Sequence, residues 1–229
     1  MKKRVPRIPV VVIHAEWPPQ EDGGATRAVR ECALSVLRQM RRDPRLSVIS
    51  LIGARATRAN VEHALTKIES KKGLVVFYGH GCMCGESLIE SQIVLREESD
   101  TTRAAISEVR AHLLWNKIVY VVACYSAKSL GLCLVNKSGC YLGYRGRVMV
   151  TLGDTLAPGF EKCVNAGLRI LLEQENATCG EAWKAIRDTH TQYVLESIDH
   201  DDVLNAWVHI NNRNALSEPL GNSNARLYN

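Results

Sequence analysis

The chain has 229 residues, of which 46% are hydrophobic and 23% charged, and its formal net charge is +5. This composition is typical of a globular protein, and it excludes a disordered tail, a fibrous repeat and a small domain that depends on disulfides. No stretch approaches the roughly 20 consecutive apolar residues of a membrane-spanning helix. We therefore expect one domain over residues 1–229 and no membrane contact.

The first residues resemble a secretory signal only in part. A basic start at residues 2–4 precedes an apolar run at 8–15, but Pro6 and Pro9 interrupt the pattern and no small-residue cleavage site follows. Without an export signal thiols are expected to stay reduced, so the eight cysteines do not indicate a disulfide framework. The sequence predicts a cytoplasmic protein.

Positive charge is concentrated in the first third of the chain. Residues 1–72 contain 15 Lys and Arg against 7 Asp and Glu, whereas residues 73–229 contain 14 against 17. Basic charge can attract nucleic acid, but here it is spread along two expected helices without a nucleic-acid motif. We expect solvated helix faces, or a surface for a protein partner, rather than direct nucleic-acid binding.

Apolar runs alternate with helical patterns along the chain. Because the runs are continuous and rich in Val and Ile, they indicate strands that are covered on both faces. The expected strands are 8–14, 46–52, 73–78 and 118–123, with a hairpin arm at 88–95 and one or two strands within 141–151. The expected helices are 25–42, 57–71, 101–115, 127–134, 158–175 and 178–198. The alternation predicts an α/β domain, a mostly parallel sheet with helices on both faces.

Two segments have no expected regular structure. Residues 16–24 form a long connection that contains two prolines and two glycines. Residues 200–229 are polar and rich in asparagine. Both segments are candidate contact surfaces for a partner.

A histidine and a cysteine follow two of the expected strands. His80 comes after the strand at 73–78, and Cys124 comes after the strand at 118–123. Ligands gather at the carboxyl ends of parallel strands, and a thiol beside an imidazole is the arrangement of a nucleophilic cysteine with its acid–base partner. These two residues are therefore candidate catalytic residues. The alternative is a core thiol at a strand end and a hydrogen-bonded turn histidine.

The residues around the pair suit the same chemistry. Gly79 and Gly81 allow a sharp bend and a close approach of substrate, and the amides of Gly81 and Cys124 are candidate donors to an oxyanion. The helix expected after Cys124 would place its N-terminus near the sulfur and favour the thiolate.

An apolar strand ending in His80-Gly81, followed by one ending in Ala123-Cys124, resembles the signature of the caspase-like (clan CD) cysteine peptidases, in particular the bacterial CHAT-domain branch. Further similar segments are 90–95, Tyr125-Ser126, the acidic turn at 152–155 and Glu181-Ala182, so that the resemblance covers about residues 73–190. The chain departs from the family at Val122, where a serine is usual, and at Ala127, where a glycine is common. Neither departure touches the chemistry.

The resemblance implies a caspase-like three-layer sandwich, with the catalytic blocks within 73–155 and C-terminal helices and a tail over 156–229. It implies a cysteine endopeptidase in which Cys124 is the nucleophile and His80 the general acid and base, with the oxyanion hole formed by the amides of Gly81 and Cys124. It also implies a protein substrate, no cofactor or metal, and control by a regulatory partner or sensor module in bacterial antiviral defence.

Asp154 follows an expected strand at the edge where a substrate would bind. In several branches of the clan an acidic pocket residue accepts Arg or Lys before the cut, so cleavage after a basic residue is one expectation. Asp154 also precedes a helix, where aspartate is a favoured N-cap. The sequence leaves these two roles open.

Other patterns have weaker interpretations. Cys82 and Cys84 beside His80 suggest zinc, but a structural zinc site usually takes four ligands in a recognisable spacing, so we expect these thiols to line the cleft. The acidic run at 199–202 lacks the spaced ligands of a calcium loop. A non-catalytic adaptor, with His80 and Cys124 present but unaligned, is the alternative function.

Overall fold

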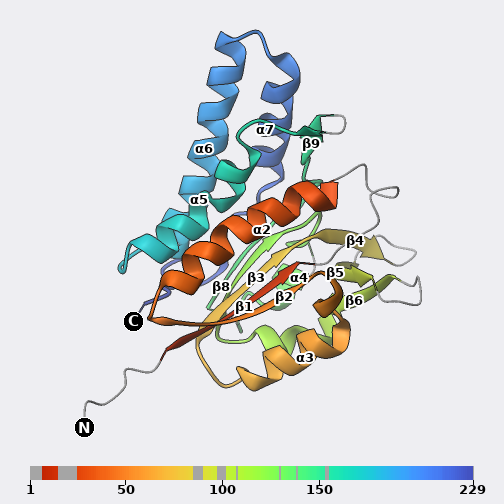
Figure 1. Ribbon diagram of the computed structural model, residues 1–229, viewed down its shortest axis with the longest axis vertical. Helices are drawn as coiled ribbons and strands as arrows, with labels where there is room; N and C mark the ends of the chain where they lie inside the picture. The colour runs from red at the N-terminus through yellow and green to blue at the C-terminus, as the bar shows by residue number, and fades with distance from the viewer. Residues whose placement is uncertain are drawn as a thin grey trace.

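The computed structural model describes residues 7–14, 25–84, 90–96, 102–106, 108–128, 130–137, 139–152 and 155–228. Its centre is a six-stranded sheet in the order β11-β8-β7-β3-β1-β2 (Figure 1). The parallel strands are β1 (Ile8–His14), β2 (Leu46–Ile52), β3 (Gly73–Tyr78), β7 (Lys117–Val122) and β8 (Cys140–Leu142), and β11 (Leu220–Gly221) is antiparallel to β8. The prediction of a mostly parallel sheet is confirmed.

The central strands of this sheet are covered on both faces. Every residue of β3 and β7 is buried. Along β1, Val10 and Val12 belong to one apolar cluster, and Val11 and Ile13 belong to another. Because each side of these strands meets apolar neighbours, the sequence contains continuous runs of branched residues instead of an alternating pattern.

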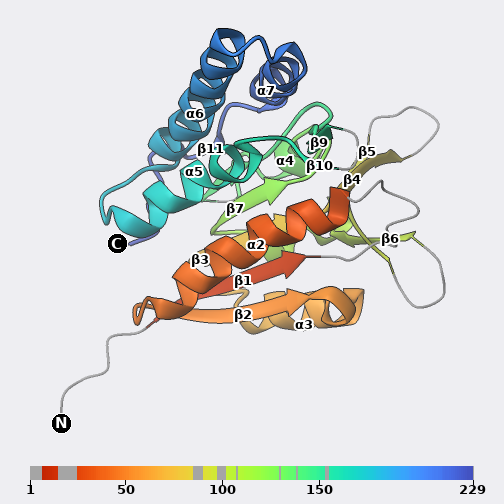
Figure 2. The same ribbon diagram turned by 45° about the horizontal axis from the view of Figure 1, so that its top comes forward.

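Helices form a layer on each face of the sheet (Figure 2). One face is covered by α2 (Ala25–Arg42), α5 (Phe160–Glu173) and α6 (Cys179–Asp199). The other face is covered by α3 (Arg58–Lys67), the 3-10 helix η2 (Glu108–Leu114) and the single turn α4 (Leu130–Cys133). The expected α/β class, with helices on both faces, is therefore confirmed.

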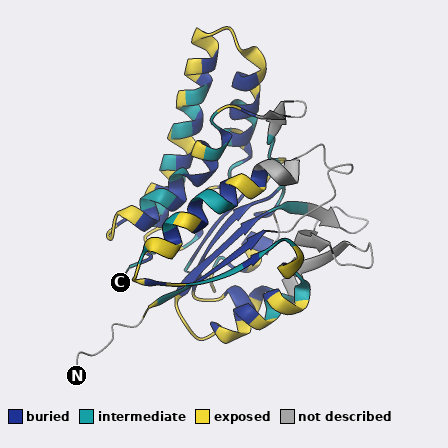
Figure 3. Cartoon of the chain, viewed as in Figure 1, coloured by how far each residue is buried: buried dark blue, intermediate teal, exposed yellow. Residues whose placement is uncertain are grey.

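A helical hairpin of α6 and α7 (Val203–Ala215) extends beyond the sheet (Figures 1 and 2). In the capping box that begins α6, the Thr178 hydroxyl accepts from the Glu181 amide and the Glu181 carboxylate accepts from the Thr178 amide. The far end of the hairpin is exposed (Figure 3). Of seven exposed large apolar side chains in the described part of the chain, five lie there: Leu195, Ile198, Val203, Leu204 and Trp207. None of the described helices is both long and apolar enough to cross a bilayer.

Two small antiparallel sheets complete the fold. One contains β4 (His80–Cys84), β5 (Glu90–Arg96) and β6 (Thr102–Ile106), and the other pairs β9 (Thr151–Leu152) with β10 (Thr155–Leu156). The prediction of a helix over 101–115 is therefore wrong. Its first part pairs with β5 as a strand, and only η2 is helical, because strand pairing overrides a weak helical pattern.

The other expected elements differ mainly at their ends. The bounds of β1, β2, β3 and α2 are those expected, whereas α3 ends at Lys67 and α4 begins at Leu130. Residues 200–229, which had no expected structure, contain α7 and β11. The connection at 16–24 lies outside the described residues.

Asn165 of α5 joins three elements in the interior. Its side chain is fully buried. Its amide nitrogen donates to the Cys32 carbonyl oxygen of α2 at 3.0 Å and to the Glu161 carboxylate at 2.8 Å, and its oxygen accepts a hydrogen bond from the Tyr78 hydroxyl at the end of β3. Asn165 therefore ties two helices to the sheet.

Replacing Asn165 by alanine removes the partner of the buried Tyr78 hydroxyl. We expect Asn165→Ala to lower the free energy of unfolding by about 1–3 kcal/mol, as measured by urea unfolding. Gln192→Ala, which removes only a surface hydrogen bond to Glu196, is the control and should change this free energy by less than about 0.5 kcal/mol. Equal effects of the two substitutions would contradict this role of Asn165.

Candidate active site

The parallel pairing of β3 and β7 brings His80 and Cys124 to the same edge of the sheet. Tyr78 and Val122 are direct partners in the register, and each candidate residue lies two positions further along its segment. Both line one cavity of about 100 Å³, together with residues that include Val148 and Val150. The structure thus brings together the two residues that the sequence singled out.

Gly81 lies against the backbone of Cys124. A Cβ atom built at Gly81 would collide with the Cys124 carbonyl oxygen. Only glycine permits this approach, because any side chain would push the two segments apart. Gly81 is therefore a neighbour of the thiol residue in space, while the oxyanion role of the two amides stays a prediction.

Several predicted site residues cannot be placed. Asp154, the candidate for selecting a basic side chain, lies outside the described residues. The side chains of Cys82 and Cys84 lie outside them as well. Their roles stay predictions from the sequence.

Tyr125, directly after Cys124, has a left-handed backbone with a φ of 55°. This conformation costs a non-glycine residue on the order of 1–2 kcal/mol. Hydrogen bonds from a neighbouring segment hold it: the Tyr125 amide donates to the Gly146 carbonyl and the Ala127 amide donates to the Tyr144 carbonyl, both at 2.9 Å. Backbone strain that the surroundings enforce is concentrated at functional sites. No pattern in the sequence signals this turn.

This turn stands where the sequence predicted the start of a helix. Because α4 begins only at Leu130 and has a single turn, the expected helix N-terminus directly after Cys124 is absent from this described segment. Burial instead dominates, and it raises the pKa of the Cys124 thiol; the Val148 amide and then Arg147 oppose this effect. At neutral pH the resting side chain is therefore a thiol.

The sulfur of Cys124 contacts the backbone of Val148. The Val148 amide donates to Sγ at 3.3 Å, and Sγ lies 3.8 Å from the Val148 carbonyl oxygen, to which the thiol donates. Residues 147–150 have no regular secondary structure. A neighbouring irregular segment therefore occupies hydrogen-bonding positions of the candidate nucleophile.

Helix α7 holds this segment in place. Asn212 is fully buried, and its side chain accepts from the Met149 amide and donates to the Met149 carbonyl oxygen, both at 2.7 Å. Asn211 donates to the Arg147 carbonyl oxygen at 2.9 Å. The backbone on both sides of Val148 is thus bound by α7, a helix that the sequence reasoning missed.

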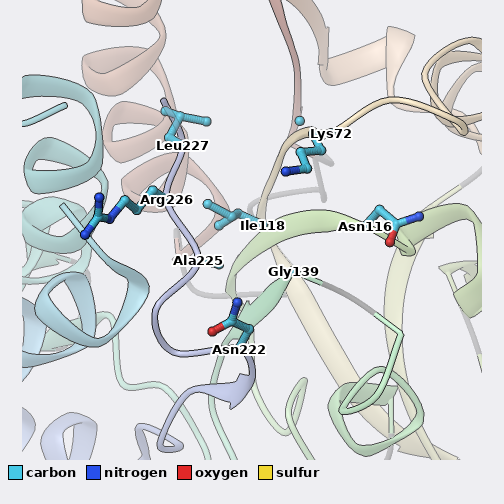
Figure 4. Close-up of a pocket in the computed structure, with 9 residues that line it drawn as sticks. Lys72, Asn116, Ile118, Gly139, Asn222, Ala225, Arg226 and Leu227 are labelled. Carbon is cyan, nitrogen blue, oxygen red and sulfur yellow. The ribbon is translucent and has the colours of Figure 1, made fainter. Parts of the chain in front are cut away.

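A second cavity, of about 200 Å³, lies at the opposite edge of the sheet, near the amino ends of β3 and β7 (Figure 4). Lys72, Asn116, Asn222 and Arg226 supply its polar side chains. Its lining residues include no cysteine, serine, histidine or carboxylate. Because it lacks a thiol or hydroxyl nucleophile with an acid–base partner, we place the candidate active site at the carboxyl edge.

A scan against protein-family models finds no match to this chain, and a search of curated proteins finds no significant similarity.

Removing the Asn212 side chain is expected to change the acidity of Cys124. In Asn212→Ala the Val148 amide is no longer held against the sulfur, and that hydrogen bond lowers the thiol pKa. The pKa of Cys124 should therefore rise further, and the alkylation of Cys124 should need a higher pH. Labelling with iodoacetamide across a pH series, followed by mass spectrometry of the Cys124 peptide, measures the midpoint.

Asn214→Ala is the matched control for this prediction, because Asn214 is an exposed residue of the same helix. It should leave the midpoint where it is in the parent protein. Urea unfolding of both variants separates a local effect from a general loss of stability. An unchanged midpoint in a well-folded Asn212→Ala protein would show that α7 does not act on the thiol.

Proposed function

We propose that the protein is a cysteine endopeptidase, a hydrolase that uses Cys124 and His80 as a catalytic dyad. The observation that carries this proposal is that the two side chains line one cavity at the carboxyl edge of the sheet. The resemblance of His80-Gly81 and Ala123-Cys124 to the caspase-like peptidases of the CHAT branch supports the same function. The three-layer α/β arrangement is compatible with that family.

In this proposal the Cys124 sulfur attacks the carbonyl carbon of a peptide bond. The thiol proton passes to His80, which gives it to the leaving amine as the carbon–nitrogen bond breaks. A water molecule that His80 deprotonates then hydrolyses the thioester and restores the thiol. The amides of Gly81 and Cys124 donate to the oxyanion, with about 3 kcal/mol of transition-state stabilisation from each donor.

The acidity of Cys124 fits a nucleophile that depends on its partner base. Burial disfavours an isolated thiolate and raises the pKa of Cys124. The thiol therefore reacts when His80 takes its proton, and not as a preformed anion. Both members of the dyad are then required for bond cleavage.

We further infer that the resting enzyme is restrained, and that a regulatory protein or sensor module releases it in the cytoplasm during bacterial antiviral defence. The contact between Cys124 and Val148 supports the restraint, because the segment that α7 binds is hydrogen-bonded to the Cys124 sulfur. A partner that moves α7 would free the nucleophile. The defence role itself rests on the resemblance alone.

Fluorogenic peptides that end in Arg, Lys, Asp or Asn test the peptidase proposal. The protein is expected to cleave at least one of them, Cys124→Ala should be inactive, and His80→Ala should lose about 100-fold or more of the rate. Cys133→Ala, which removes an exposed thiol, is the control and should retain full activity. Full activity of the purified chain without a trigger would contradict the restraint but not the peptidase.

If no peptide is cleaved, two explanations remain, a restrained enzyme and a non-catalytic adaptor. A peptidyl acyloxymethyl ketone makes this distinction, since it labels a thiol that an imidazole assists. His80-dependent labelling of Cys124 supports the enzyme. Labelling that persists in His80→Ala would support the adaptor, whereas absent labelling is expected of both, because the restraint would also block the ketone.

Within this function we propose that Asp154 selects an arginine or lysine before the cut. The support is its negative charge and its position in the sequence, two residues after the end of β9. Asp154→Asn should lower kcat/KM for the Arg and Lys peptides by roughly 30-fold, the loss expected when a charge pair is broken, and should spare other cleaved peptides. The alternative role of a helix N-cap is wrong, because Thr155–Leu156 forms β10 and α5 begins at Phe160 with Gly159 as its N-cap. A purely structural role of Asp154 would instead affect all substrates alike and lower the thermal stability.

A further inference from the structure

A cysteine and two histidines meet among the three C-terminal helices. Cys163 belongs to α5, His190 to α6 and His209 to α7, and all three are fully buried. One possible ligand atom from each lies within 4.8 Å of the other two. These three residues are far apart in the chain and match no spacing motif, so the sequence does not signal the cluster.

The hydrogen bonds determine which nitrogen of His209 faces the cluster. Its Nε2 lies 2.7 Å from the Pro158 carbonyl oxygen. Since that oxygen can only accept, Nε2 carries the proton and donates it. The lone pair is then on Nδ1, which lies 3.0 Å from His190 Nδ1 and 3.7 Å from Cys163 Sγ. Histidines that bind metals commonly hold their other N–H on a carbonyl oxygen in this way.

Hydrogen bonds alone satisfy this cluster poorly. The single lone pair of His209 Nδ1 is faced by two donors, the His190 ring and the Cys163 thiol. The other ring nitrogen of His190, Nε2, is buried without a hydrogen-bond partner among the described residues. The ring of His190 is therefore oriented by the contact of Nδ1 with the cluster. The hydrogen bonds among the three side chains therefore leave one of the two donors without an acceptor, and a cation that binds the lone pairs of the cluster would remove this competition.

We propose that Cys163, His190 and His209 bind a zinc ion that ties α5, α6 and α7 together. Zinc prefers thiolate and imidazole ligands, with bonds of about 2.3 Å to sulfur and about 2.0–2.1 Å to nitrogen. Tetrahedral bonds of these lengths separate the ligand atoms by roughly 3.3–3.6 Å. The observed separations of 3.0 and 3.7 Å lie close to this range, and the third separation, between Cys163 and His190, is within 4.8 Å.

The binding step balances without any redox partner. Cys163 releases its thiol proton to solvent and becomes a thiolate ligand. The proton of His190 moves from Nδ1 to Nε2, so that Nδ1 of each ring gives its lone pair to the zinc ion. Burial lowers the pKa of both histidines, which favours the neutral rings, and raises that of the Cys163 thiol, so that zinc binding must supply the free energy of thiol deprotonation. A water molecule completes the fourth position of the tetrahedron.

This site would reach the wall of the catalytic cavity through α7. Asn212, which holds the backbone of Met149, lies one turn after His209 on the same helix. A zinc ion on His209 would therefore fix the helix that binds the segment beside Cys124. The inference does not depend on the peptidase proposal, and it departs from the expectation of a chain without metal.

Zinc content and cobalt(II) binding of the full chain test the site. A background with Cys82→Ser, Cys84→Ser and Cys124→Ala removes the thiols near His80 as a source of binding. Protein prepared with zinc and then dialysed should retain about one zinc ion per chain. Cobalt(II) should give a thiolate-to-cobalt charge-transfer band in the near ultraviolet and the intense visible bands of a tetrahedral site.

Substitutions in this background assign the ligands. Cys163→Ser should remove the charge-transfer band, and His190→Gln should weaken cobalt affinity by at least about 10–100-fold. Cys133→Ser, at an exposed thiol, is the control and should leave both unchanged. A charge-transfer band that persists in Cys163→Ser would overturn the proposal, because another cysteine would then be the ligand.

A measurement on the background protein alone covers the case in which the variants do not fold. Adding zinc to metal-free protein should raise its unfolding temperature, since an ion that binds only the folded state stabilises it. No rise in temperature, together with no retained zinc and no cobalt band, would show that the three residues form a hydrogen-bonded cluster without metal.

Discussion

The parallel pairing of β3 with β7 is the constraint on which the candidate site depends. Both strands are buried along their whole length, so packing on two faces fixes their register. That register sets Tyr78 opposite Val122, and the chain beyond each residue leads into the same cavity. The meeting of His80 and Cys124 is therefore a result of hydrophobic packing in the sheet, and it does not require any attraction between the two side chains.

The C-terminal helix α7 positions another part of the cavity wall, the segment that contains Val148. Through Asn211 and Asn212, α7 binds the backbone on both sides of Val148. The same helix packs on α5 and α6 through a buried polar cluster that contains His209. The expected catalytic blocks end near residue 155. The segment that contacts the Cys124 thiol is nevertheless held by α7, a helix that comes later in the chain.

The sequence could predict the sheet and the meeting of His80 and Cys124, because apolar runs identify buried strands and parallel connections align their carboxyl ends. It could not predict α7, because that helix inverts the usual pattern. It buries polar residues such as Asn205 and Asn212 while Leu204 and Trp207 are exposed, so its apolar positions do not mark an inner face. The turn at Tyr125 could not be predicted either, because hydrogen bonds to residues 144–146, which are distant in the sequence, impose its conformation.

The left-handed backbone of Tyr125 has a consequence for the energy of opening the site. Its conformation is maintained by carbonyl groups of Tyr144 and Gly146, which are continuous with the segment that contacts Cys124. When that segment moves away, the backbone of Tyr125 can return to an ordinary region of φ and ψ and release about 1–2 kcal/mol. This release offsets part of the cost of the hydrogen bonds that break. In the proposed restrained enzyme, the strained turn therefore lowers the free energy that is needed to open the site.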